Sequence, residues 1–519
     1  MTARTTAMPS GARPDIAEIS VEQIQAGFAS GAFTAEMLAE ACLDRITTYN
    51  GRYNAIIFLN PDVLADARAI DQRRSSGQAL GPLAGVPVVI KDPMDMQGFP
   101  TTAGWSLLYS KKGGVDLMPE ADAPVVARMR AAGAIMLGKT NAPVLSYHTT
   151  NANNSWAGPT LNAVLTDRAP GASSAGTATA VAASMAVVGL AEETAGSIQN
   201  PASAQGLVGI KPTFGLVPNV GVVPLSGSRD VVGPISRCVR DAALCLDVLA
   251  GYSSEDPKTI AGVGRRPRGG YTAQLRADAL AGKRIGLYGI GWREQPLSAE
   301  TSELYQRAQS EIKAQKATLL TDPFAGSGFA KLAKITPGSF MDARGLESLP
   351  HDIHAYLTRL GPSAALRSFA EFAKATAADN VFGPNGRLQS AHNLPAFAAC
   401  LSDPVRSPDL SAFFALREAY LSAFSEVFER HRLDALIFPQ MREEIPALRD
   451  ERVIQETTVS EINIAGLPGV VVPAGYYKSG APFCLIIVGR MWSEGDLLGY
   501  AFAYEQGTKH RRAPLLQTA

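Results

Sequence analysis

Residues 170–213 read PGASSAGTATAVAASMAVVGLAEETAGSIQNPASAQGLVGIKPT. Two short turns of small residues, 171–176 and 194–197, contain serine and lie on either side of an Ala/Val-rich segment. Ser173 or Ser174 can cap a helix over residues 175–187, and the VVGLA run that ends it predicts a short buried strand. Because a helix followed by a strand can return the chain to its starting point, Ser173 and Ser197 could be neighbours in space.

The second turn consists of residues small enough to let a backbone approach a ligand closely. Thr194, Ala195, Gly196 and Ser197 could aim several N–H groups at one point, as an oxyanion hole requires. Small residues also form ordinary tight turns, so composition alone leaves both interpretations open.

The whole stretch resembles the signature of the amidase signature family, whose usual form is GGSSGGS followed by DTGGSIRxP and GxKPT. The resemblance implies a Ser-cisSer-Lys triad, with Ser197 as nucleophile, Ser173 after a cis peptide bond as the bridging residue, and Lys91 as the base. It extends from roughly residue 20 to residue 510 and is dense only in residues 80–240. It implies amide hydrolysis that needs no metal and no organic cofactor.

The resemblance also implies an α/β fold with a large mixed, mostly parallel central sheet covered by helices on both faces. The chain itself supports this fold, because predicted strands and helices alternate after residue 80. We expect a flexible tail over residues 1–15 and an amidase signature domain over residues 16–515. Within that domain we expect an N-terminal helical layer (16–80), a signature core (81–250) and a variable, mostly helical substrate-pocket region (about 325–432).

The signature departs from its usual form at several positions. Alanine replaces glycine at Ala172, Ala175 and Ala195. Since alanine narrows the allowed backbone, these positions are expected to have negative φ. Glu193 stands in place of aspartate and Gln199 in place of arginine, and we expect the two side chains to hydrogen-bond to each other. Ser174, Glu193 and Gln199 are therefore predicted to support the turn.

Lys91 follows the apolar run GVPVVI, which predicts a central strand. Burial at that position would lower the pKa of a lysine and let its amine accept a proton. Lys139 also follows a predicted strand, so the residues alone do not separate the two lysines, and only the resemblance selects Lys91. His148 is the one histidine near these motifs, and neither serine lies in a Gly-x-Ser-x-Gly elbow, which disfavours a Ser-His-Asp hydrolase.

Several large side chains near the motifs are candidates for a substrate pocket, although a place in the core suits each equally well. They are Met94, Met96, Trp105, Tyr147, His148 and Trp156. Such a lining would favour an apolar or aromatic substrate.

Composition limits the partners. The chain has 519 residues, 46% of them hydrophobic, and 48 basic residues balance 48 acidic ones. This balance favours neither nucleic acid nor an anionic membrane surface, and a small neutral substrate fits better. Five scattered cysteines without metal-ligand spacing indicate reduced core residues and a cytoplasmic protein. The most apolar window, about twelve residues at 180–191, is too short to cross a bilayer.

We therefore expect a cytoplasmic amidase that cleaves a small apolar or aryl carboxamide to a carboxylate and ammonia or an amine, through an acyl-enzyme on Ser197. An aryl acylamidase, a carbamate or ester hydrolase, or a peptide amidase would use the same residues. The A subunit of the tRNA-dependent amidotransferase is disfavoured by the neutral charge and the altered signature. A non-catalytic binding protein is disfavoured by the intact Lys91, Ser173 and Ser197. The chain could act as a homodimer.

Overall fold

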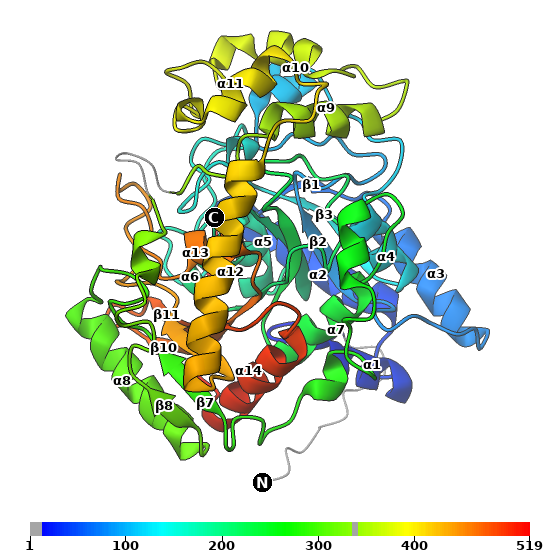
Figure 1. Cartoon of the computed structure of the whole chain (residues 1–519). Helices are drawn as coiled ribbons and strands as arrows, with labels where there is room; N and C mark the ends of the chain where they lie inside the picture. The colour runs from blue at the N-terminus through cyan, green and yellow to red at the C-terminus, as the bar shows by residue number, and fades with distance from the viewer. Residues whose placement is uncertain (1–12, 335–340, 519) are drawn as a thin grey trace.

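A central sheet of eleven strands runs through the computed structural model, which describes residues 13–334 and 341–518 (Figure 1). In their order across the sheet, the strands are β1 (Ile56–Leu59), β3 (Ile135–Thr140), β2 (Pro87–Lys91), β4 (Val188–Glu193), β6 (Val231–Ser236), β5 (Val208–Lys211), β10 (Gly469–Tyr476), β11 (Pro482–Val488), β9 (Ala435–Pro439), β7 (Arg284–Leu287) and β8 (Thr318–Leu320).

Strand pairing in this sheet is mixed. The trio β3, β2 and β4 is parallel, as is the trio β9, β7 and β8, and the other neighbouring strands are antiparallel. The expected α/β fold with a large mixed sheet is confirmed. Parallel pairs are a minority of the pairs between described strands, however. In one of the antiparallel pairs, the short connection of residues 477–481 between β10 and β11 leaves no room for the crossover that a parallel pair would need.

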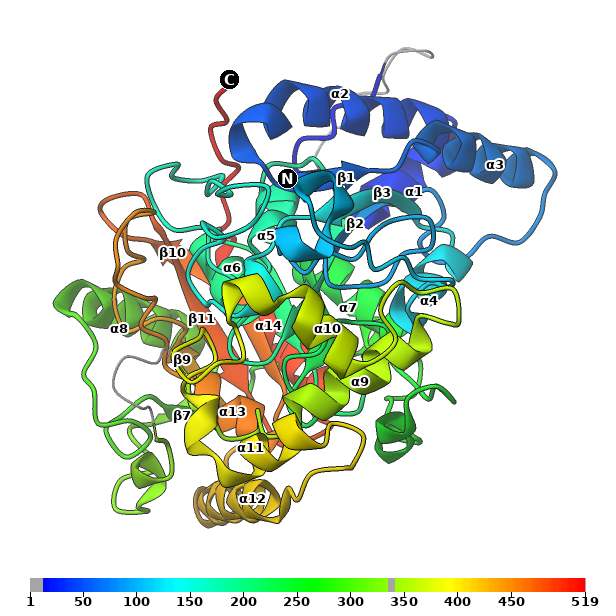
Figure 2. The ribbon, with the colours of Figure 1, turned by 90° about the horizontal axis from the view of Figure 1, so that it is seen from above.

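Helices cover both faces of the sheet (Figures 1 and 2). The pair α5 (Ala175–Ala182) and α6 (Gln199–Ala204) packs against one face, and α7 (Val239–Leu249) packs with α14 (Glu494–Thr508) against the other. Every residue of α5 is buried, and its side chains are small. A Cβ at Gly189 of β4 would lie only 2.3 Å from Thr177 Cγ2, so small residues on both elements permit this close helix-to-sheet approach.

The helix that the sequence predicts over residues 175–187 ends earlier, at Ala182. Ser184 has a left-handed φ of 54°, which a continuing α-helix does not allow. Residues 188–193 then form β4, and this strand is the predicted one extended to Glu193.

The N-terminal helices lie along the β1 and β3 side of the sheet, coloured blue in Figure 2. Ser20 and Gln23 form a capping box at the start of the first of them. The remaining helices of the body are α1 (Val21–Ser30), α2 (Ala35–Tyr53), α3 (Val63–Ser75), α4 (Pro124–Ala131), α8 (Ala299–Ala314) and α13 (Val459–Ala465). The predicted tail at residues 1–15 lies, apart from residues 13–15, outside the described residues.

A helical layer sits above one end of the sheet, at the top of Figure 1. It contains α9 (Leu349–Arg359), α10 (Phe369–Ala375) and α11 (Pro395–Ser402), and α12 (Ser411–His431) runs from this layer down the body. A second apolar cluster, separate from the main core, joins side chains of this layer to residues of the body. It includes Trp105, Val144, Leu145, Tyr147, Ala195, Leu346, Ile353, Phe372, Leu388 and Val459.

No helix in the described part of the chain is both long enough and apolar enough to cross a membrane.

Candidate active site

Lys91 is the last residue of β2, the middle strand of the parallel trio. Parallel strands end at the same edge of a sheet, so the register that places Ile90 beside Leu190 brings Lys91 next to the end of β4. The Lys91 side chain is fully buried. Its Nζ lies 2.5 Å from Ser173 Oγ and 2.5 Å from Glu192 Oε1.

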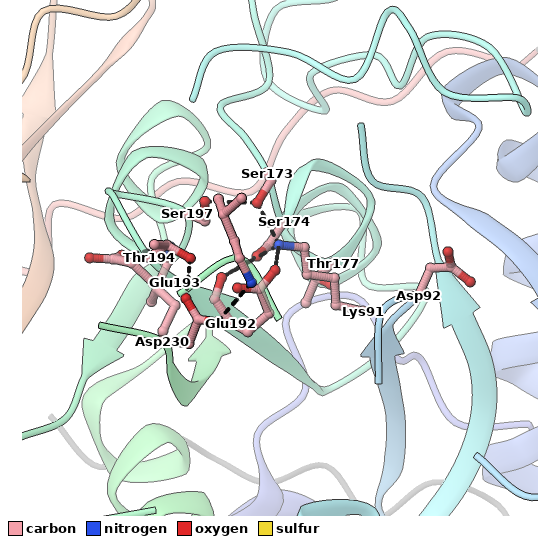
Figure 3. A network of polar contacts seen from close by, with 12 residues as sticks. Lys91, Asp92, Ser173, Ser174, Thr177, Glu192, Glu193, Thr194, Ser197 and Asp230 are labelled. Atoms are coloured by element: carbon pink, nitrogen blue, oxygen red, sulfur yellow. Dashed lines mark hydrogen bonds and ion pairs between the residues drawn. The ribbon is translucent and has the colours of Figure 1, made fainter. Parts of the chain in front are cut away.

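The two serine-containing turns meet at this strand edge. The peptide bond between Ala172 and Ser173 is cis, as the family resemblance implies. Ser173 precedes α5, and Ser197 lies between β4 and α6. Their Oγ atoms are 2.7 Å apart, so the helix and strand between them do return the chain to its starting point. Figure 3 shows the resulting line of contacts among the three side chains, with Asp92 pointing away from it.

Backbone conformation explains which glycines of the signature remain. Gly171 and Gly196 have left-handed φ values of 73° and 93°. None of the three alanines that replace glycine has positive φ, as predicted. Within residues 13–334 and 341–518, no acceptor pairs with the backbone N–H groups of residues 194–197. These donors are therefore available to an oxygen placed beside Ser197.

Glu193 holds the second turn against α6. One of its carboxylate oxygens accepts hydrogen bonds from the N–H groups of Ile198 (2.8 Å) and Gln199 (3.1 Å). The other accepts from the Gln199 side-chain amide, as expected, and from Asn463 Nδ2 at 2.8 Å. Ser174 Oγ donates to the main-chain oxygen of Glu192 at 3.4 Å. The three predicted supporting residues thus contact the turn and the strand that leads to it.

Charge is concentrated at the buried end of the site. Burial lowers the pKa of Lys91, and the carboxylate of Glu192 acts in the opposite direction. Asp230, which accepts a hydrogen bond from Thr194 Oγ1, has its pKa raised to about 7 by burial and by the charge of Glu192. Neither Glu192 nor Asp230 was identified from the sequence. The signal for Glu192 was the doubled glutamate at the end of a buried strand, whereas nothing local marks Asp230.

The six candidate pocket residues separate into groups. Met94 and Met96 are fully buried in the main core, whereas Trp105 and Tyr147 share the second apolar cluster with Ala195. His148 Nδ1 accepts from the N–H groups of two residues that follow it, and burial lowers its pKa, with the charge of Arg387 adding to the effect. Trp156 donates to Thr102 Oγ1 at 2.8 Å. Of these six residues, only Trp105 and Tyr147 share an apolar cluster with Ala195 of the second turn.

Lys139, the alternative base, is fully buried but points elsewhere. Its Nζ donates to Pro100 O (2.8 Å) and Thr101 Oγ1 (3.1 Å) and lies 3.6 Å from Asp92 Oδ1. It makes no hydrogen bond to either serine among the described residues. Among the described residues, no group of three or more His, Cys, Asp or Glu side chains is placed so that it could hold a metal ion.

Known proteins resemble this chain over nearly its full length. The family model described as Amidase matches residues 37–498. The A subunit of the glutamyl-tRNA(Gln) amidotransferase of Chloroflexus aggregans is 31% identical over 96% of this chain and 99% of the relative. A probable amidase of Arabidopsis thaliana is 30% identical over 96% of this chain and 92% of its own. The solved structure of the peptide amidase of Stenotrophomonas maltophilia superposes with a TM-score of 0.79 at 31% identity, covering 96% of this chain and 99% of that one.

Proposed function

This chain belongs to the amidase family, and we propose that it hydrolyses the amide bond of a small carboxamide through an acyl-enzyme on Ser197. The observation that carries the proposal is the unbroken line of short contacts from Lys91 Nζ through Ser173 Oγ to Ser197 Oγ. Such a line can remove the proton from an attacking hydroxyl, the requirement that any serine nucleophile has to meet.

In the proposed reaction, Ser197 Oγ attacks the carbonyl carbon as its proton passes to Ser173 and a proton of Ser173 passes towards Lys91. The free N–H groups of residues 194–197 hold the oxygen that becomes negative. The proton returns through Ser173 to the leaving nitrogen, and the amine or ammonia departs. Water then attacks the acyl-enzyme by the same route and releases the carboxylate.

We propose an apolar or aryl acyl group for the substrate. The second apolar cluster includes Ala195, and it also includes Trp105 and Tyr147. Apolar side chains beside the nucleophile favour apolar substrates, since a polar substrate would lose its hydration there without compensation. The similarity to a peptide amidase supports an amide as the cleaved bond, and anilides, carbamates and esters are the alternatives that the same residues could serve.

The second candidate is the role of an amidotransferase A subunit, because a relative with that name is 31% identical to the chain. In that role the chain would release ammonia from glutamine and would need companion subunits. The two candidates differ in what the purified chain does alone. A cytoplasmic location and a homodimer stay predictions.

The test is a panel of amides, anilides, carbamates and esters, with glutamine included, given to the purified chain. We expect turnover of an apolar or aryl amide without ATP, tRNA or another protein, and a decrease of at least roughly 10⁴-fold in Ser197→Ala. Added hydroxylamine should divert the acyl group to a hydroxamate. Full activity of Ser197→Ala would refute the assignment of Ser197 as the nucleophile. Turnover of glutamine and of no other substrate, and only after companion subunits are added, would favour the amidotransferase role.

A further inference from the structure

Glu192 extends the line of contacts beyond Lys91. The residue is 4% exposed, and the same Lys91 Nζ that lies 2.5 Å from Ser173 Oγ also lies 2.5 Å from Glu192 Oε1. Four side chains therefore follow one another without a gap: Ser197, Ser173, Lys91 and Glu192 (Figure 3).

The carboxylate changes what Lys91 can do. An ammonium group has no lone pair, so a lysine held as a cation cannot accept a proton from Ser173 unless it releases one of its own. A buried carboxylate at hydrogen-bond distance stabilises the ammonium form. The lysine therefore needs a receiver for its proton, and the atom in contact with it is Glu192 Oε1.

We propose that Glu192 is the final proton acceptor of the relay and that Lys91 passes the proton on to it, an inference that rests on the function proposed above. As Ser197 Oγ bonds to the carbonyl carbon, its O–H bond breaks and the proton goes to Ser173. The proton of Ser173 goes to Nζ, and one N–H bond of Lys91 breaks as a proton moves to Oε1.

The charges balance in this step. Lys91 begins and ends as an ammonium, and Glu192 changes from a carboxylate to a neutral acid. One negative charge thus moves from Glu192 to the substrate oxygen held by the free N–H groups of residues 194–197. The reverse transfer protonates the leaving nitrogen. Glu192 touches no substrate and acts only through Lys91.

The other charged groups around Lys91 are accounted for differently. Glu193 points to the start of α6, where its oxygens accept four hydrogen bonds, and it faces the charge of Lys211. Asp230 is bound by Thr194 and by the N–H groups of residues 225 and 226, and it faces the charge of Arg229. Asp230 is therefore the other acid in the site that could produce a pH-dependent change.

The experiment measures how fast an alkyl fluorophosphonate labels the full-length protein between about pH 5 and about pH 10, with intact mass as readout. This probe reacts with an activated serine and does not require the substrate to be known. In the wild type, Glu192 is at hand to take the proton of Lys91, so Ser197 should stay reactive below the pH at which Lys91 would lose its proton unaided. In Glu192→Gln, reaction should begin only where Lys91 itself loses its proton.

The acidic limb of the pH profile is the range over which labelling slows as the pH falls. We expect Glu192→Gln to move this limb upward by about one pH unit or more and to slow labelling about 10-fold or more below it, with recovery at high pH. Glu192→Asp should keep the limb near that of the wild type. If Glu192→Gln folds poorly, Glu192→Thr replaces it in the experiment. This variant also removes the carboxylate, with a smaller side chain, and the same shift of the limb is expected. Coincident profiles, or a loss of equal size at every pH, would overturn the proposal.

Two further variants test which acid sets the acidic limb of the labelling profile. Glu494→Gln removes a fully buried glutamate elsewhere, whose carboxylate accepts from the Thr213 N–H, and should leave the limb in place. If Asp230→Asn moves the limb and Glu192→Gln does not, the acid is Asp230 and the proposal is wrong. Absence of Ser197-dependent labelling in the wild type would refute the proposed function itself, whereas normal labelling with an unshifted Glu192→Gln refutes only the role of Glu192.

Discussion

Gly196 and Ala195 are adjacent, yet the fold places opposite demands on them. Gly196 has a φ of 93°, and a Cβ there would lie 2.8 Å from Val459 Cγ2 and 2.9 Å from Asn200 Nδ2. Ala195 avoids positive φ, and its methyl group packs in the second apolar cluster. The usual glycine at position 195 is thus dispensable to the backbone, whereas the glycine at 196 is required.

Gly196→Ala should therefore destabilise the protein by about 1–3 kcal/mol and disturb the donors beside Ser197, with a marked loss of activity. Ala195→Gly, the matched change, should lower stability by only about 0.4–1 kcal/mol, mainly because the unfolded chain gains freedom, and should retain activity. Urea unfolding and steady-state rates on the best amide of the panel check both. Equal effects of the two changes would contradict this account of the turn.

At the scale of elements, the junction between β4 and α6 depends on one carboxylate. Helix α6 has 6 residues, which is too short to be stable alone. Glu193 accepts from the N–H groups of Ile198 and Gln199, as a negative group at a helix N-terminus should, and Asn463 of α13 contacts the same side chain. Strand, nucleophile turn and two helices are thereby fixed to one another.

Gln199→Ala should cost about 1.5–3 kcal/mol, because a buried charged acceptor loses one of its donors. The same change removes the acceptor of Thr458 Oγ1, which lies 3.0 Å from Gln199 Oε1. The exposed Gln506→Ala is the control and should stay within about 0.5 kcal/mol of the wild type. Urea unfolding measures both, and a Gln199→Ala value as small as the control would show that the junction does not depend on this bond.

At the scale of the molecule, contacts between distant segments join the layers. Glu505 of α14 accepts from the N–H of Val239 at the start of α7, at 2.8 Å, although the two residues are 266 positions apart. Burial raises the pKa of Glu505 to about 7, and the hydrogen bond from Val239 opposes this rise. We therefore expect the contribution of Glu505 to the packing of α14 on α7 to depend on pH.

A raised folded-state pKa means that the neutral acid is favoured in the folded protein. Its stabilising contribution is fully present below the unfolded-state pKa and is lost as the pH rises through about 7. Glu505→Gln keeps an acceptor oxygen and cannot ionise, so it should gain in Tm relative to the wild type as the pH increases. Thermal unfolding of both proteins from about pH 5 to about pH 9 tests this. A constant Tm difference would show that Glu505 does not titrate in that window.

Much of the site could be predicted from the sequence because its signals are local in the chain. The signature identified Ser173, Ser197 and Lys91, which the structure brings together. The glycine-to-alanine changes predicted negative φ correctly, since a Cβ restricts its own backbone wherever it lies. The helix and strand between the serines were likewise predicted from periodicity, apart from the end of the helix at residue 182.

Other features depended on strand pairing and packing between distant segments. Lys91 ends β2, and Lys139 is the last residue but one of β3. The two lysines differ in their neighbours: β4 places Glu192 beside Lys91, and the turn before α5 places Ser173 there. Met94 and Met96 entered the main core, whereas Trp105 joined the cluster beside Ala195. No local pattern distinguishes these outcomes.

The sequence by itself determined the family and the two serine-containing turns, because each is encoded by adjacent residues whose conformation is restricted locally, and the resemblance to the family then selected Lys91. Only the tertiary structure decided what Glu192 and Glu193 do. Successive residues of a strand point to opposite faces, so one of two identical neighbours contacts Lys91 and the other contacts the start of α6. Which one does which follows from the elements packed on each face of β4, and these come from distant parts of the chain.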